Sequence, residues 1–151
     1  MVKTAAQRSR AVSPAPTLVP IHSWFERRGW TPLLFQQRSW TAYLEGSSGL
    51  IQVPTGSGKT FAAVMGPIAR MLAETGDHPG IRLLYITPLR ALSRDLALAI
   101  REPISEMRWP LRVGIRNGDS SSSERSKQLK SPPQILVTTP ESLTLLLSNS
   151  K

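Results

Sequence analysis

Residues 54–60 read Pro-Thr-Gly-Ser-Gly-Lys-Thr and lie between a predicted strand at 49–53 and a predicted helix that begins near Lys59. Gly56 and Gly58 allow the backbone to fold so that successive N–H groups point inward at an anion. The helix that follows adds the positive end of its dipole. A strand, a glycine-rich loop and a helix in this order predict a phosphate-binding loop.

The residue types of this loop suit a nucleoside triphosphate. Lys59 offers a flexible positive charge to the β- and γ-phosphates, and the Thr60 hydroxyl suits Mg²⁺. Val53 stands where the strict pattern has its first glycine, and a glycine-rich hinge after a strand is the alternative interpretation. We therefore predict ATP and Mg²⁺ as cofactors, Thr60 as a metal ligand, and a nucleotide site formed by Thr55, Gly56, Ser57, Gly58, Lys59 and Thr60.

Strands and helices alternate along the rest of the chain. Short, largely apolar segments predict strands at 49–53, 81–86, 111–115 and 134–138. Strands that are apolar on both faces and separated by helices are typical of a parallel sheet covered on its faces. The predicted fold class is therefore α/β, with a parallel sheet flanked by helices.

Helix boundaries follow from local signals. Capping-box spacing and a terminal glycine predict a helix over 23–29. A proline at the first helical position predicts another over 32–46. The helix over 89–101 should stop near Pro103, because proline interrupts a helix interior.

Composition narrows the class of partner. The chain has 151 residues, with 19 Lys+Arg against 10 Asp+Glu and a net charge of +9. A net charge this positive favours a polyanion as the binding partner, most often nucleic acid; the alternative is a basic surface that only contacts solvent. The sequence has no cysteine, and it has no apolar run of the ~20 residues that a bilayer span needs. We predict a disordered extension over 1–20 and one domain over 21–151.

Four further motifs resemble those of superfamily 2 helicases, in order and at fitting spacing. Trp30-Thr-Pro-Leu-Leu-Phe-Gln36 resembles the Q motif, and Gln36 lies 23 positions before Lys59. Thr87-Pro-Leu-Arg-Ala-Leu92 resembles motif Ia. Arg116-Asn-Gly-Asp119 resembles the glycine-containing loop that follows, and Thr138-Thr-Pro-Glu-Ser-Leu143 resembles motif Ib.

The resemblance implies a RecA-like P-loop NTPase domain, here incomplete and ending after motif Ib. It implies that Gln36 reads adenine, since an amide can both donate to and accept from one base edge. It also implies that Arg90, Gly118 and Thr139 hold the backbone of one nucleic-acid strand.

Within the superfamily the motifs are most similar to the Lhr group, and residues 24–60 to bacterial ligase-associated DExH-box helicases. DEAD-box RNA helicases would instead show Pro-Thr-Arg-Glu-Leu and Thr-Pro-Gly-Arg in the corresponding places. The likeness implies the ATP-binding part of an ATP-dependent DNA helicase or translocase in the bacterial cytoplasm. It further implies DNA as the partner, a role in DNA repair, and repair partners such as a ligase.

ATP hydrolysis needs catalytic side chains in addition to a phosphate-binding loop. The family places them in a DExH segment and on a second domain, and no Asp-Glu dipeptide occurs in the sequence. We therefore expect this chain alone to be incompetent in hydrolysis. A non-catalytic nucleic-acid-binding module and a different P-loop enzyme, such as a small kinase, are the alternative functions.

Purely structural roles are the alternative for several of these residues. Arg90 and Asp119 could be ordinary helix-start and turn residues. Asp95 and Glu102 should lie on a solvated helix face. The aromatic residues near the amino terminus are expected in the core rather than stacked on a base. They are Trp24, Trp30, Phe35 and Trp40.

Overall fold

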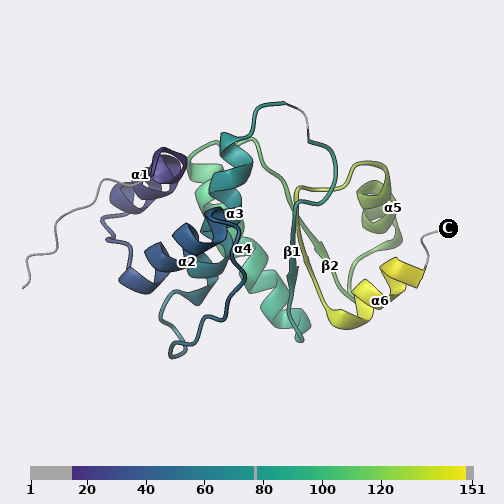
Figure 1. Cartoon of the computed structure of the whole chain (residues 1–151). Coiled ribbons are helices and arrows are strands. Elements are labelled where there is room, and N and C mark those ends of the chain that lie inside the picture. Colours follow the sequence, from purple (N-terminus) through teal and green to yellow (C-terminus); the bar gives the residue numbers. More distant parts are fainter. Residues whose placement is uncertain (1–14, 77, 149–151) are drawn as a thin grey trace, which may run out of the picture.

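Three parallel strands form a sheet in a computed structural model that describes residues 15–76 and 78–148 (Figure 1). The strands are β1 (Leu83–Ile86), β2 (Val113–Arg116) and β3 (Ile135–Thr138), in the order β1-β3-β2. Ile135 pairs with Leu83 on one side and with Val113 on the other. The predicted parallel sheet is confirmed, and β3 is its fully buried central strand.

Six α-helices surround the sheet in the described residues. In Figure 1 helices α1 to α4 lie on one side of the sheet, and α5 and α6 lie on the other. Among these residues no helix is both long and apolar enough to cross a membrane. The helices are α1 (Val19–Arg27), α2 (Leu34–Leu44), α3 (Lys59–Ala73), α4 (Arg90–Glu106), α5 (Ser122–Lys130) and α6 (Pro140–Ser148), and a short 3-10 helix (Pro16–Leu18) precedes them.

The hydrophobic core lies between the sheet and helices α1, α3 and α4. Ile135 and Val137 project from the same face of β3, because side chains two apart share a face of a strand. They are fully buried together with Val64 and Ile68 of α3 and Ile100 of α4. Packing between these elements holds the helix that follows the phosphate loop against the rest of the domain.

An aromatic cluster joins α1 to the carboxyl end of α4. The Trp24 indole is fully buried and donates a 2.8 Å hydrogen bond to Glu106. Arg28 lies over the Trp30 ring and pairs with both Glu102 (2.7 Å) and Glu106 (2.8 Å). Glu102 was expected on a solvated helix face; its side chain is 41% exposed, and it also forms an ion pair with Arg28.

The prediction that the aromatic residues near the amino terminus lie in the core holds in part. Trp24 and Trp40 are fully buried, which confirms the core assignment for both. Trp30 is 44% exposed, because it lies at the surface end of the aromatic cluster. Asp95 is exposed, as expected of a solvated helix face.

Several helix boundaries differ from those predicted. Helix α1 begins at Val19, and Leu18 is buried in the core, so the predicted domain boundary at residue 21 lies inside a helix. Residues 1–14 of the predicted extension lie outside the described residues. Helix α2 begins at Leu34 rather than at residue 32, because Leu33 is extended and is the N-cap.

Helix α4 continues through Pro103, where the sequence predicted its end. Pro103 is buried inside the helix, which reaches Glu106. The burial of Ile104 and the pairing of Glu102 and Glu106 with Arg28 occur only if the last turn forms. These contacts offset the hydrogen bond that proline cannot make.

The strand predicted at 49–53 is absent from the sheet. This segment follows α2 and leads into the phosphate loop without pairing to any strand in the described residues, and Leu50 is 88% exposed. A strand needs a hydrogen-bonded neighbour, and local sequence can predict an extended backbone without supplying that neighbour.

Replacing Glu106 with alanine should lower the free energy of unfolding by about 1–3 kcal/mol, because the buried Trp24 N–H would lose its acceptor. Urea unfolding of the 151-residue chain measures this change. Asp95→Ala on the exposed face of the same helix is the control and should have little effect. Equal stability of the two variants would contradict the anchoring role of Glu106.

Candidate functional site

The phosphate loop joins residue 53 to the first turn of α3. Gly56 and Gly58 have φ angles of 80° and 84°, in the left-handed region that favours glycine. Ser57 bonds back to Pro54, with its hydroxyl 2.6 Å from the carbonyl oxygen. The loop is thereby closed on itself directly before the amino-terminal end of a fifteen-residue helix, where N–H groups and the dipole favour an anion.

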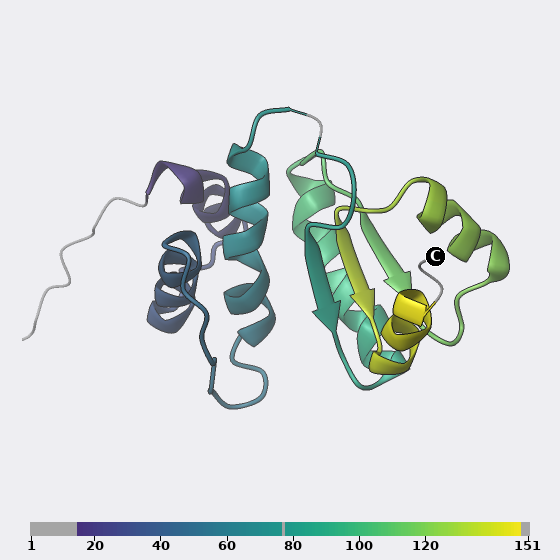
Figure 2. The same cartoon turned by 45° about the vertical axis from the view of Figure 1, so that its right-hand side comes forward.

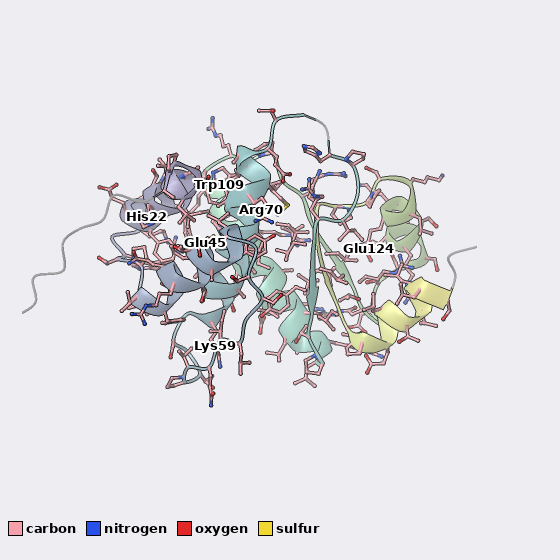
Figure 3. All side chains as sticks on the ribbon, viewed as in Figure 1. His22, Glu45, Lys59, Arg70, Trp109 and Glu124 are labelled. Atoms are coloured by element: carbon pink, nitrogen blue, oxygen red, sulfur yellow. The ribbon has the colours of Figure 1, made fainter. Side chains whose placement is uncertain are left out.

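Lys59 begins α3 with its side chain folded over the loop. Its Nζ donates a 3.1 Å hydrogen bond to the carbonyl oxygen of Val53. A main-chain carbonyl makes this contact, so valine in place of the glycine of the strict pattern leaves it intact. Figure 3 shows Lys59 at the loop edge of the molecule. The ammonium group is exposed and can move from Val53 to a bound phosphate.

The donor set of this loop fits the phosphates of a nucleotide with Mg²⁺. The left-handed glycines and the helix start supply main-chain N–H groups, and Lys59 supplies a charge. In the part of the chain that the structure describes, no group of three or more His, Cys, Asp or Glu residues could hold a metal by itself. Thr60 in the first turn of α3 suits a cation that takes its other ligands from phosphates and water.

Gln36 lies in contact with the phosphate loop. It is only 4% exposed, and its two amide ends both have partners in the chain. Oε1 accepts a hydrogen bond from the Leu33 N–H (2.9 Å), and Nε2 donates to the Gly58 carbonyl (3.1 Å). The sequence suggested a base-reading glutamine, and the structure adds that Gln36 ties the start of α2 to the loop.

Gly58 has a second reason to be glycine. A Cβ at this position would lie 2.6 Å from Nε2 of Gln36, whereas a Cβ on Gly56 would meet no atom within 4 Å. Both positions need positive φ, but only Gly58 also needs the missing side chain.

A second candidate site lies at the carboxyl ends of the strands. A cavity of about 480 Å³, here called the Arg90 groove, contains all three residues predicted to hold nucleic acid, Arg90, Gly118 and Thr139. These residues follow β1, β2 and β3 in turn. The carboxyl ends of parallel strands meet at one edge of a sheet, so three distant segments line one cavity.

Other residues also line the groove: Glu141 and Ser142 belong to the segment that resembles motif Ib, whereas Arg125 was not predicted from the sequence. Arg125 of α5 and Ser142 of α6 line it, as does the carboxylate-bearing Glu141. Burial lowers the pKa of the neighbouring Arg116, and the positive charge of Arg125 lowers it further. The place of Arg125 in the groove depends on how α5 packs on the loop after β2, which no single motif encodes.

Thr139 is turned toward its own helix. It is 3% exposed, and its hydroxyl accepts a long 3.4 Å hydrogen bond from the Ser142 N–H. It therefore shapes the start of α6, where main-chain N–H groups are available to an anion.

The loop after β2 is fixed to α4 by a buried hydrogen bond. Asn117 is 2% exposed, and its Nδ2 donates to the hydroxyl of Ser93 (2.8 Å). Asn117 Oδ1 in turn accepts from the main chain of Asp119 (2.9 Å). Gly118 lies against Arg90, and a Cβ there would come within 2.4 Å of its guanidinium carbon.

The two candidate sites lie on the same side of the molecule. The arrowheads of the three strands point to the lower side of Figure 2, and the connection between α2 and α3 extends to that side. A phosphate site and a basic groove thus share one edge of the domain.

Comparisons with known proteins identify the family of the chain. The family model described as DEAD/DEAH box helicase matches residues 34–151. The chain is 37% identical to the Lhr helicase/uracil glycosylase of Escherichia coli, with 83% of this chain and 9% of the relative covered. It is 36% identical to the ATP-dependent helicase Lhr-Core of Methanocaldococcus jannaschii, with 87% and 17% covered.

A solved structure matches the fold closely. The Mycobacterium smegmatis helicase Lhr bound to ssDNA and AMP-PNP superposes with a TM-score of 0.78 at 34% identity. The match covers 90% of this chain and 19% of the other. The chain thus spans less than a fifth of the length of these relatives.

Gly56→Ala should lower the free energy of unfolding by about 1–2 kcal/mol, the cost of positive φ alone. Gly58→Ala should lower it further, because its Cβ would also meet Gln36. In Gly58→Ala the Gln36 amide is already displaced, so adding Gln36→Ala should cost less than it does in the unmodified chain. Urea unfolding of the double-mutant cycle measures this coupling. Strictly additive effects would show that Gln36 and Gly58 act independently.

Proposed function

The chain belongs to the DEAD/DEAH box helicase family, and from this we propose that it supplies the nucleotide-gripping part of an ATP-dependent DNA helicase or translocase. The observation that carries the proposal is the shared edge of the phosphate loop and the Arg90 groove. A helicase or translocase must bind both a nucleotide and a nucleic-acid strand, and this domain offers a candidate site for each on the same side. The named relatives are ATP-dependent or DNA-bound helicases, which supports this reading.

In the nucleotide site we propose that main-chain N–H groups over Thr55–Gly58 surround the phosphates of ATP. Lys59 would leave Val53 and pair with the β- and γ-phosphates, and Thr60 would hold Mg²⁺. Mg²⁺ would neutralise the phosphate charge and hold the γ-phosphate for transfer to water. Gln36 would sense adenine while bonded to Gly58, so that base and phosphate recognition are linked through one side chain.

In the groove we propose that Arg90, the main chain at Gly118 and the start of α6 at Thr139 bind successive phosphates of one strand. Phosphate contacts hold the strand without reading its sequence. Such binding suits a motor that moves along DNA of any sequence.

The cellular role, the location and the partner proteins are also proposals. The likeness of residues 24–60 to ligase-associated helicases supports a role in DNA repair in the bacterial cytoplasm, with partners such as a ligase. We further propose that the 151-residue chain hydrolyses ATP negligibly by itself. Hydrolysis also needs a group that orients water and arginines that neutralise developing charge.

Lys59→Ala should weaken ATP binding by about 10- to 100-fold, because a charge-assisted contact to phosphate is worth about 1.5–3 kcal/mol. Titration with a fluorescent ATP analogue and Mg²⁺ measures the loss. Lys130→Ala at the exposed end of α5 removes the same charge and should bind normally. Unchanged affinity of Lys59→Ala would refute the nucleotide site.

Lys59→Ala also distinguishes the proposed ATP-dependent function from the alternative, a nucleic-acid-binding module without catalysis. If ATP binding and DNA binding are coupled in this domain, ATP should change the affinity for single-stranded DNA, and Lys59→Ala should abolish that response. A non-catalytic nucleic-acid-binding module would bind DNA identically with or without ATP.

Arg90→Ala should weaken binding of single-stranded DNA by about three- to tenfold and reduce the salt slope by about 0.7, as expected for one lost phosphate contact. Fluorescence anisotropy over a range of salt concentrations measures both. Arg38→Ala, an exposed arginine of α2, is the control. Equal losses in the two variants would indicate general charge attraction instead of a groove.

A further inference from the structure

We propose that Asp119 is a built-in counter-ion of the Arg90 groove, one that occupies two arginines and weakens the grip on a phosphate backbone. The inference rests on the proposed function of the groove. It gives Asp119 a role in setting the affinity for nucleic acid, beyond that of an ordinary turn residue.

The Asp119 carboxylate bridges two arginines of α4. Arg90 Nη1 donates to Oδ1 (3.2 Å), and Arg94 Nη2 donates to Oδ2 (2.8 Å). The two arginines are four residues apart and share a face of the helix. One carboxylate therefore neutralises two of the cations that follow β1, and it does so with both of its oxygens.

The main chain that carries Asp119 is tied to α4 by hydrogen bonds. Asp119 N–H donates to Oδ1 of Asn117 (2.9 Å), and Asn117 donates to Ser93, which precedes Arg94 on α4. Ser93 is fully buried, and its own hydroxyl bonds to the Arg90 carbonyl (2.6 Å). The loop and the helix start are thus joined by hydrogen bonds, which place the main chain of Asp119 beside the first two turns of α4.

The contacts favour competition over orientation. The Arg90 guanidinium also lies close to Gly118, where a Cβ would come within 2.4 Å of its carbon, so Arg90 has a packing contact besides its ion pair with Asp119. The side chains of Arg90, Arg94 and Asp119 are 64%, 61% and 43% exposed, so their ion pairs are weak. A phosphate seeks the same N–H donors as the carboxylate and is repelled by its charge.

Asp119→Asn tests the proposal, because it removes the charge and keeps the size and turn preference of the side chain. We expect fluorescent oligothymidylate to bind about threefold more tightly at low salt, a modest gain because exposed ion pairs are weak. The salt slope should become steeper, because more cations then meet phosphates. Anisotropy titrations of the 151-residue chain measure both quantities.

Glu124→Gln is the matched control. Glu124 lies on α5 (Figure 3) and accepts a hydrogen bond from Ser121. Glu124→Gln changes the net charge by the same amount as Asp119→Asn. Glutamine retains the capping contact, and its affinity for the oligonucleotide should match that of the unmodified chain. In an Arg90→Ala/Arg94→Ala background, Asp119→Asn should lose its effect, and matching circular dichroism spectra verify that each variant is folded.

The outcomes separate the two proposals. If Arg90→Ala weakens binding but Asp119→Asn equals Glu124→Gln, the counter-ion role is refuted while the groove stands. Weaker binding by Asp119→Asn would also refute it, and would show that the carboxylate orients the arginines. If the unmodified chain fails to bind, or Arg90→Ala has no effect, the proposed function of the groove itself fails, and the counter-ion role with it.

Discussion

The structure depends on the burial of β3 between its two parallel neighbours. Its four residues are all buried, and each pairs with one residue of β1 and one of β2. Parallel pairing brings the carboxyl ends of all three strands to one edge. Any polar group that directly follows a strand is then delivered to that edge, regardless of its distance in sequence. The Arg90 groove is a direct consequence, because its residues come from the ends of β1, β2 and β3.

Helix α4 links this edge to the opposite end of the domain. Its first two turns carry Arg90 and Arg94, and its last turn carries Glu106, which bonds the buried Trp24 of α1. Helix α1 precedes the segment that leads to Gln36, and Gln36 bonds the phosphate loop. The groove and the loop are therefore connected through one helix and one aromatic cluster. Spatial connection alone is no evidence of coupling, which is why the response of DNA binding to ATP is the informative quantity.

Sequence reasoning succeeded where the determinants were local. The glycines and lysine of 54–60 define a loop by themselves, and apolar runs at 81–86, 111–115 and 134–138 gave three strands that overlap those observed. It failed where a distant partner decides. The segment 49–53 has strand-like residues but no neighbour to pair with, and α4 passes Pro103 because α1 holds its last turn. The placement of Arg125 in the groove likewise depends on how α5 packs, which no short motif encodes.

The two candidate sites use glycine in the same way. At Gly58 and at Gly118 the absent Cβ makes room for a side chain from another element, Gln36 in one case and Arg90 in the other. In each case a functional side chain lies against the main chain of a loop, in addition to its hydrogen bonds or ion pairs. A ligand that shifts either loop would move that side chain with it. The glycines of this domain therefore do more than permit turns, because they place the residues proposed to recognise ATP and DNA in contact with the loops that the two ligands would bind.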